Sequence, residues 1–331
     1  MNFSENLNQM NDGTDKGNMD LHSLNKRAEG RKLLYIINPI SGTKNKSSLQ
    51  VLIESKTKHA GIDFAFYPSV AGGDYSFLFP VIKEQGFTDI IIAGGDGTIN
   101  QAVNSLRVLG LPFGIIPCGS GNGLAFSAGI PKNPSRALDI IFSGQGRHID
   151  AFMINDSFAC MLCGLGFDAQ VAHDFANDPK RGLLTYVRKT VAHFFTAGTY
   201  SFIMEINGKE IKTDAFFISI ANSNQFGNHF TIAPKASLED GLLDIVVMTK
   251  QNKLNVLLQA CLQVGGYNKL QETDVLNEKA SVLYFQTPSI KISNPQHAPM
   301  HIDGDPLETM EYLEIRMIPK CFELLQSASG I

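Results

Sequence analysis

The sequence predicts an α/β + all-β protein, in which an N-terminal Rossmann-like α/β domain precedes a β-sandwich domain. In the first half, short β-branched apolar runs alternate with segments of helical periodicity. Glycine-rich loops follow two of these runs. From about residue 147 strand-like segments predominate and many are joined by turns, which favours an antiparallel sandwich with one or two helical insertions.

The domain boundaries follow from changes in composition along the chain. Residues 1–30 are rich in Asn, Asp and Gly and poor in branched apolar side chains, so we expect a disordered tail. We place a nucleotide-binding α/β domain at 31–146 and the β-sandwich at 147–318, with the active site in the cleft between them. Residues of about 319–326 are expected to return to the first domain.

Composition excludes several classes of protein. The 331 residues have a net charge of −4 and a pI of about 6.1, which argues against a nucleic-acid-binding protein. No apolar run approaches the ~18 residues that a membrane-spanning helix needs. The N-terminal segment lacks an apolar signal core, and Cys160 and Cys163 fit core thiols better than a zinc or redox site. We therefore expect a cytoplasmic protein.

The first domain is expected to contain buried parallel strands, each followed by a helix. The strands are predicted at 33–37, 62–67, 90–93 and 112–117. The helices are predicted from Ser47, from Gly73 to about Gln85, over 99–106, after the loop at 118–123, and over 134–143.

The stretch that organises the chain is Gly94-Gly95-Asp96-Gly97-Thr98, between the strand at 90–93 and the helix at 99–106. Strand, glycine turn and helix together direct backbone N–H groups and a helix dipole at a phosphate. Asp96 would repel a phosphate unless a cation lay between them. It therefore indicates either a Mg²⁺-nucleotide or a base that acts on an acceptor hydroxyl. The simpler alternative is a βα loop that only turns the chain.

A second glycine-rich loop, Cys118 to Gly123, follows the strand at 112–117. Ser120 and the backbone N–H groups can donate to phosphate, and Asn122 can bond a nucleotide or cap the following helix. A small polar loop, Asn38 to Gly42, also follows the first strand, where α/β folds bind ligands. Two glycine-rich loops in one sheet predict a nucleotide site more specifically than either loop does alone.

The second domain is predicted from strand-like segments and turn signals. The strands are expected at 149–154, 158–165, 200–206, 215–221, 243–248, 281–285, 290–292 and 312–317. Asn155-Asp156 and Asn207-Gly208 are expected as turns, and the second pair is a strong hairpin signal. Two further Asp-Gly sequences, at Asp240 and Asp303, fit ordinary turns when each is considered alone.

Taken together, these motifs resemble a known family. GGDGT at 94–98 is the signature shared by diacylglycerol kinases, sphingosine kinases, the bacterial lipid kinases like them, and NAD kinases. The run PxGSGNxLAxxxGIP at 117–131, NPISG at 38–42 and the late Asp303-Gly304-Asp305 resemble the lipid kinases. The chain departs from the family in having Asn122-Gly123 where many bacterial members have Asn-Asp, and Asp305 where the family motif is DGE.

The resemblance implies a site for ATP and Mg²⁺ and a catalytic group for phosphoryl transfer. It implies Asp305 as the general base, supported by Asp303 and Asp96. It implies a structural Mg²⁺ held by Asp240 and the carbonyls of Ser237 and Leu242. The ATP-binding residues that it implies are Asn38, Pro39, Ser41, Gly42, Thr43, Ser69, Gly94, Gly95, Asp96, Gly97, Thr98, Asn100, Gly119, Ser120, Gly121 and Asn122.

The resemblance also implies a lipid substrate that the second domain presents at a membrane surface, and a homodimer. The segment 180–198 places aliphatic and aromatic side chains on one helical stripe with Arg181 and Arg188 at its rim. This pattern suits an anionic membrane, although a helix packed on the sandwich explains it equally. We therefore expect a cytoplasmic enzyme with peripheral membrane association. The sequence does not specify the lipid.

Two alternatives remain open at this point. An NAD kinase shares GGDGT and a β-rich second domain. A nucleotide- or lipid-binding protein with impaired catalysis is suggested by Asp305, because its carboxylate arm is one carbon shorter than that of Glu. A misplacement of about 1 Å at a reacting centre can cost ~10²-fold in rate.

Overall fold

The computed structural model describes residues 30–39, 46–167, 169–170, 198–224, 233, 235–249 and 282–327. Several sequence-based expectations lie outside these ranges. They are the tail before residue 30, the loop residues Ser41, Gly42 and Thr43, the segment 180–197, and the first residue of the strand expected at 281–285.

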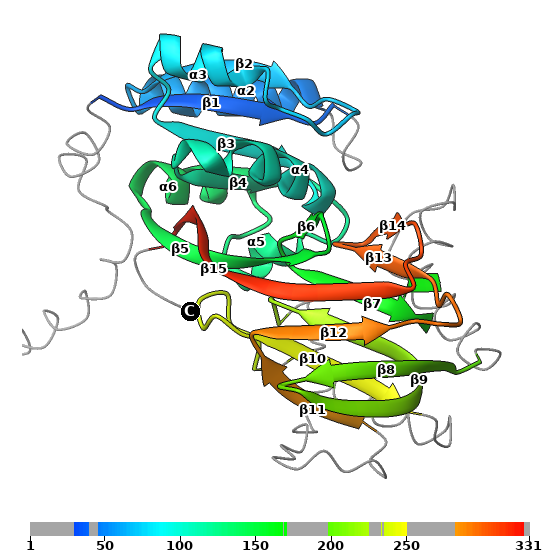
Figure 1. Cartoon of the computed structure of the whole chain (residues 1–331). Coiled ribbons are helices and arrows are strands. Elements are labelled where there is room, and N and C mark those ends of the chain that lie inside the picture. The colour runs from blue at the N-terminus through cyan, green and yellow to red at the C-terminus, as the bar shows by residue number, and fades with distance from the viewer. Residues whose placement is uncertain are drawn as a thin grey trace, which may run out of the picture.

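The first domain is a parallel sheet covered by helices (Figure 1). Its strands are β1 (Lys32–Ile37), β2 (Asp63–Pro68), β3 (Asp89–Gly94) and β4 (Phe113–Pro117). Its helices are α2 (Lys46–His59), α3 (Leu78–Gln85), α4 (Asp96–Leu106), the 3-10 helix η1 (Arg107–Leu109), α5 (Gly123–Ser127) and α6 (Pro134–Ser143). The strands lie in the order β2-β1-β3-β4. The α/β expectation is confirmed.

Alternating side chains of each strand pack into two separate cores, because successive residues of a strand point to opposite faces. Leu34 and Ile92 pack with buried side chains of α3, α4 and α5. Leu33 and Ile91 pack with α2 and α6. The first of these cores also includes Phe158 and other buried residues of the second domain, so the two domains share apolar contacts on the α4 side.

The second domain consists mainly of antiparallel strands (Figure 1). They are β5 (Gln145–Ile154), β6 (Ser157–Ala159), β7 (Leu162–Gly166), β8 (Tyr200–Ile206), β9 (Lys209–Ala221), β10 (Leu243–Thr249), β11 (Val282–Thr287), β12 (Ser289–Ser293), β13 (Met300–Ile302), β14 (Asp305–Leu307) and β15 (Tyr312–Gln326). The predicted turn between β8 and β9 is confirmed, since Asn207 and Gly208 both have positive φ, at 51° and 76°.

A long antiparallel pair, β5 and β15, joins the two domains into one continuous sheet. Residues 312–316 of β15 pair with β12, and residues 315–318 and 322–326 of β15 pair with β5. Near its end Leu324 is in register with Phe113 of β4. The strand order through the sheet is therefore β14-β13-β7-β9-β8-β12-β15-β4-β3-β1-β2. The end of β15 thus lies beside the sheet of the first domain.

Two sequence-based element predictions are wrong in detail. The helix expected from Gly73 begins only at Leu78, because the Asp74 carboxylate accepts from the Ser76 backbone N–H at 2.8 Å and holds a local turn. The single strand expected at 158–165 is broken into β6 and β7. Cys160 and Met161 form the bend between them, and their backbone N–H groups bond to a side chain from another strand.

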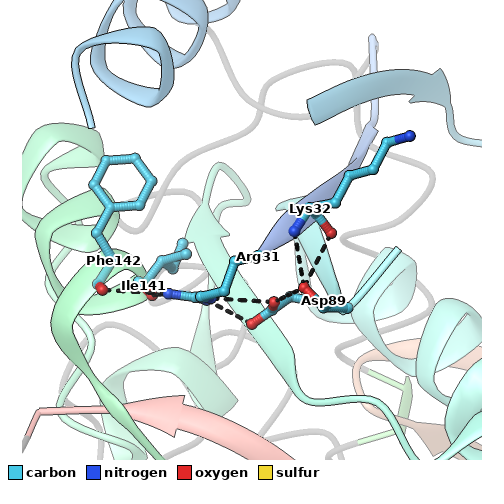
Figure 2. Close-up of polar contacts among 6 residues, drawn as sticks. Arg31, Lys32, Asp89, Ile141 and Phe142 are labelled. Atoms are coloured by element: carbon cyan, nitrogen blue, oxygen red, sulfur yellow. Dashed lines mark hydrogen bonds and ion pairs between the residues drawn. The ribbon is translucent and has the colours of Figure 1, made fainter. Parts of the chain in front are cut away.

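The amino ends of β1 and β3 are tied by a buried ion pair (Figure 2). Arg31 donates to both carboxylate oxygens of Asp89, at 2.5 and 3.2 Å, and to the carbonyls of Ile141 and Phe142 at the end of α6. The Thr88 hydroxyl also donates to Asp89, at 2.6 Å. All three guanidinium nitrogens and both carboxylate oxygens are thereby engaged, as charges largely removed from water require.

Within the described part of the chain, no helix is long and apolar enough to cross a membrane.

Candidate active site

The two predicted glycine-rich loops lie in direct contact beyond the carboxyl ends of β3 and β4. Gly95 is the N-cap residue of α4, and Gly119 follows β4. A Cβ built on Gly119 would lie 2.6 Å from Gly95 Cα, which is closer than real Cβ atoms come to such a neighbour. Gly119 is therefore required for this approach. Cys118 N donates to Gly94 O at 2.8 Å and holds the loops together.

Asparagine side chains brace both loops. Asn122 accepts from Gly119 N at 2.7 Å and donates to Gly119 O at 2.8 Å, and it is fully buried. Asn122 occupies the N-cap position of α5, but its side chain makes no cap hydrogen bond, so the capping role expected from the sequence is wrong. Asn38 Nδ2 donates to Thr98 Oγ1 at 2.7 Å and joins the end of β1 to the first turn of α4.

The Asp96 carboxylate lies between the loops. A Cβ on Gly121 would lie 3.0 Å from Asp96 Oδ2. Burial raises the pKa of Asp96 to about 6, while hydrogen bonds from the backbone N–H groups of Gly123, Leu124 and Asn122 lower it. Asp96 Oδ1 is buried and has no hydrogen-bond partner among the residues that the structure describes. An unpaired buried oxygen of this kind suits a cation ligand or a proton acceptor.

The hairpin β13–β14 brings the late acidic motif against α4. Ile302 is in register with Asp305, so Asp303-Gly304 is a two-residue hairpin loop, and both residues have positive φ, at 50° and 89°. Such loops favour Asp-Gly. Asp305 Oδ2 occupies the space beside Gly97 that a Cβ there would need. The Asp305 carboxylate of the second domain therefore lies against the GGDGT loop of the first domain.

Asp305 and Asp303 differ in their surroundings. Asp305 is exposed as a residue, but partial desolvation raises the pKa of its carboxyl, and the charge of Asp303 raises it further while His301 lowers it. Asp303 is only 7% exposed and accepts four N–H groups, from Asn100 Nδ2 at 2.7 Å and from the backbones of Cys160, Met161 and Leu162 at 2.9 Å each. Burial raises its pKa as well.

Most of the described residues among those predicted to bind ATP lie at the two glycine-rich loops and the end of β1. Asn38, Gly94, Gly95, Thr98, Gly119 and Gly121 line the two loops and the end of β1, and Ser120 is exposed. Pro39 and Ser69 follow β1 and β2, where Ser69 N donates to Ile37 O. Asn100 is different, because its amide nitrogen donates to Asp303 and to Phe158 O at 2.9 Å, both in the second domain.

The turn predicted to hold a structural Mg²⁺ is well braced. Asp150 is 1% exposed and accepts from Gly241 N and Lys320 N at 2.7 Å each. Asp240 Oδ1 accepts from Leu242 N at 3.0 Å, and Gln286 lies 3.4 Å from Asp240 Oδ2. Burial raises the pKa of Asp240, and the charge of Asp150 adds to this.

The described residues contain no group of three or more His, Cys, Asp and Glu side chains that could hold a metal ion. The set predicted for the turn has one carboxylate, Asp240, with the carbonyls of Ser237 and Leu242. It therefore depends on main-chain oxygens, and Mg²⁺ at this turn stays a prediction.

Sequence reasoning missed the residues that support the site from the second domain. The backbone N–H groups of 160–162, which hold Asp303, lie within a run that resembles one buried strand. Asn222 is fully buried and donates to Asp150 O and Cys160 O. The polar, glycine-bearing run at 221–227, which follows an apolar strand, is the sequence signal that predicts an approach of this segment to the cleft.

Models of two known protein-family domains match most of this chain. The model of the diacylglycerol kinase catalytic domain matches residues 32–154, and the model of the YegS C-terminal NAD kinase beta sandwich-like domain matches residues 162–326. The chain belongs to the diacylglycerol kinase-like family of lipid kinases. It is thus an enzyme of a phosphotransferase family.

Several known lipid kinases are similar to this protein over most of its length. A diacylglycerol kinase of Mycobacterium tuberculosis is 28% identical over 92% of this chain and 98% of its own. A diacylglycerol kinase of Bacillus subtilis is 27% identical over 83% of this chain and 90% of its own. A solved structure of a Bacillus anthracis diacylglycerol kinase has a TM-score of 0.68 and 19% identity, and covers 91% of this chain and 98% of its own. At that identity the structural match supports the fold alone.

Proposed function

We propose that the protein is an ATP-dependent lipid kinase, which transfers the γ-phosphoryl group of ATP to the hydroxyl of a membrane lipid that is diacylglycerol-like or sphingoid-like. The observation that supports this most directly is the contact of Asp305 with Gly97, since it sets a carboxylate of the second domain beside the phosphate-type loop of the first. The family, in which relatives are named diacylglycerol kinases, supports the same reaction class.

In this proposal the nucleotide phosphates lie over the first turn of α4 and the loop at 119–121. The first backbone N–H groups of a helix have no partner within the helix, so the first turn of α4 has donors directed at an anion. The Asn38–Thr98 and Asn122–Gly119 hydrogen bonds fix the shape of the loops before the nucleotide arrives. Such preorganisation is the main contribution that a protein makes to phosphoryl transfer.

Asp305 is the proposed proton acceptor. Partial desolvation raises the pKa of its carboxyl, which improves its match to a hydroxyl proton near neutral pH. The proton leaves the lipid hydroxyl for an Asp305 oxygen as the hydroxyl oxygen bonds to the γ-phosphorus and the bond from phosphorus to the ADP oxygen breaks. The short arm of Asp305 is no obstacle in this proposal, because its carboxylate already reaches Gly97.

Mg²⁺ is proposed as the cofactor that accompanies ATP. Among the described residues, the buried and unpaired Asp96 Oδ1 is the oxygen that we assign to it. When bound, Mg²⁺ supplies charge neutralisation of the nucleotide phosphates. A second, structural Mg²⁺ is proposed at Asp240, with the carbonyls of Ser237 and Leu242.

We further propose that the enzyme is cytoplasmic, associates peripherally with the membrane that holds its substrate, and forms a homodimer. The support is the family resemblance together with the absence of a membrane-spanning helix in the described residues. Flotation with vesicles of anionic lipid tests the membrane association. Sedimentation at micromolar concentration tests the dimer.

The deciding experiment is ATP-dependent phosphorylation of a lipid panel in mixed micelles with Mg²⁺, with NAD⁺ as a parallel acceptor. The panel contains diacylglycerol, phosphatidylglycerol and a sphingoid base. Wild type should phosphorylate at least one lipid, and Asp305→Asn should lower kcat by about 10²- to 10⁴-fold, as loss of a general base does. Phosphorylation of NAD⁺ instead would identify an NAD kinase. Nucleotide binding without phosphorylation of any acceptor would support the binding-protein alternative.

A further inference from the structure

The Asp303 carboxylate is saturated with hydrogen bonds. Its Oδ1 accepts from Met161 N and Leu162 N, and its Oδ2 accepts from Cys160 N and Asn100 Nδ2. The residue is 7% exposed. A carboxylate with both oxygens doubly engaged and little access to solvent is poorly placed to receive a proton from a substrate hydroxyl.

The hydrogen-bond partners of the Asp303 carboxylate come from two separate parts of the fold. Asn100 belongs to α4 of the first domain, whereas the three backbone N–H groups belong to the bend at Cys160 and Met161 and to Leu162, the first residue of β7. Asp303 N donates in turn to Leu162 O at 2.9 Å. One side chain thus joins the β13–β14 hairpin to the helix that begins at the GGDGT loop.

The same hairpin and the same helix meet a second time, about one helical turn away. Asp305 lies two residues after Asp303, and Gly97 lies three residues before Asn100. Residues three apart on a helix lie on the same face. The Asp303–Asn100 bond and the Asp305–Gly97 contact therefore lie side by side. The first bond fixes the position of the hairpin that the second contact depends on.

We propose that Asp303 is a positioning residue, which acts through Asn100 and the 160–162 backbone to hold Asp305 against the first turn of α4, and that it accepts no proton in the reaction. This rests on the proposed function in that Asp305 is the proton acceptor. It also assigns Asn100 to the contact between the domains instead of to the nucleotide.

A double-mutant cycle on the full chain tests the proposal, with the lipid that wild type phosphorylates as acceptor. Asn100→Ala and Asp303→Asn should each lower kcat by up to about 10²-fold, which is the cost of a misplacement of about 1 Å. The double variant should be no slower than the slower single variant, because both changes break the same bond. Losses that multiply would overturn the proposal.

The pH dependence of kcat separates positioning from proton transfer. In Asp303→Asn the ionisation that limits kcat at low pH should persist, since it belongs to Asp305. Disappearance of that ionisation in Asp303→Asn, with retention in Asp305→Asn, would show that Asp303 is the base and would contradict the proposal. Asn104→Ala, an exposed position one turn further along α4, is the matched control and should leave kcat unchanged.

A measurement that needs no activity keeps this inference separate from the proposed function. Amide hydrogen exchange at residues 160–162 should accelerate by about tenfold or more in Asp303→Asn, because their acceptor is weakened. Asp89→Asn, a buried position at the far end of β3, controls for general destabilisation and should leave the ratio of these rates to the rest of the sheet unchanged. If no lipid is phosphorylated but exchange accelerates, only the proposed function fails. Unchanged exchange would overturn the positioning role itself.

Discussion

Aspartates lie near both ends of strand β3, Asp89 at its amino end and Asp96 just beyond its carboxyl end, and the protein treats their carboxylates in opposite ways. At the amino end, the Asp89 charge is neutralised by the Arg31 guanidinium, which also bonds the last carbonyls of α6 (Figure 2). At the carboxyl end, the carboxylates of Asp96 and Asp303 are held by N–H groups, and among the described residues no Lys or Arg side chain forms an ion pair with either of them. The first arrangement stabilises the fold.

The second arrangement leaves negative charge uncompensated inside the protein. Burial raises the pKa of Asp96 and of Asp303, and the charge of Asp303 adds to the shift of Asp96. Perturbed carboxylates that cluster without a cation are typical of functional sites, where a metal ion or a proton completes the charge balance. The comparison indicates that the same residue type serves stability at one end of a strand and chemistry at the other.

Breaking the ion pair at the amino end should affect stability alone. Arg31→Ala leaves Asp89 buried without its partner, so the free energy of unfolding should fall by about 3 kcal/mol. The value of kcat for the folded fraction should not change, because the change lies at the opposite end of β3 from Gly94. Urea denaturation together with kinetics at low temperature checks both parts. A large loss of kcat at undiminished stability would contradict the comparison.

Filling the space beside Gly97, beyond the carboxyl end of β3, should lower kcat and leave stability nearly unchanged. In Gly97→Ala the new methyl group meets Asp305 Oδ2, so the carboxylate must move, and kcat should fall by about 10²-fold with a small change in stability. Gly72→Ala is the matched control, because a Cβ there meets no atom within 4 Å. Steady-state kinetics and thermal melts of the two variants measure both effects. Equal kcat values for the two variants would show that the contact between Asp305 and Gly97 does not matter for turnover.

A longer side chain at residue 305 tests whether Asp in place of the family's Glu impairs catalysis. Asp305→Glu adds a methylene group where the carboxylate already touches Gly97. The longer arm must displace the carboxylate by part of an ångström, so kcat should fall by about tenfold. The binding-protein alternative expects the reverse, that Glu creates activity that wild type lacks. Kinetics of the Asp305→Glu variant on the same lipid therefore separate the two.

The smallest effect concerns the pH dependence of stability. The pKa of Asp96 is raised from 3.8 to about 6, so the folded state disfavours its ionised form, and stability is lost as the pH rises between those values. Between pH 5 and pH 6 wild type should lose about 1 kcal/mol more than Asp96→Asn does. Asp244, whose pKa is also raised to about 6, is present in both proteins and cancels in the comparison. Parallel denaturation curves at the two pH values measure the difference.

Much of the fold was predictable because local patterns and tertiary packing agree. The strands β1, β3 and β4 are continuous apolar runs, as strands covered on both faces must be. The start of α3 was less predictable, since Asp74 favours its own local turn over a helical start. The bend at 160–161 was not predictable from an apolar run, because its cause is an acceptor that lies about 140 residues further along the chain.

The sequence by itself determined the chemistry available to this protein: two glycine-rich loops after parallel strands, and Asp96, Asp303 and Asp305 in motifs that resemble a lipid kinase family. Only the tertiary structure decided what each carboxylate does. Asp303 and Asp305 are separated by one glycine, yet one is enclosed by four N–H groups and the other lies against Gly97. The reason is physical, since the role of a carboxylate depends on its burial and its hydrogen-bond partners, and the fold brings those partners from distant segments.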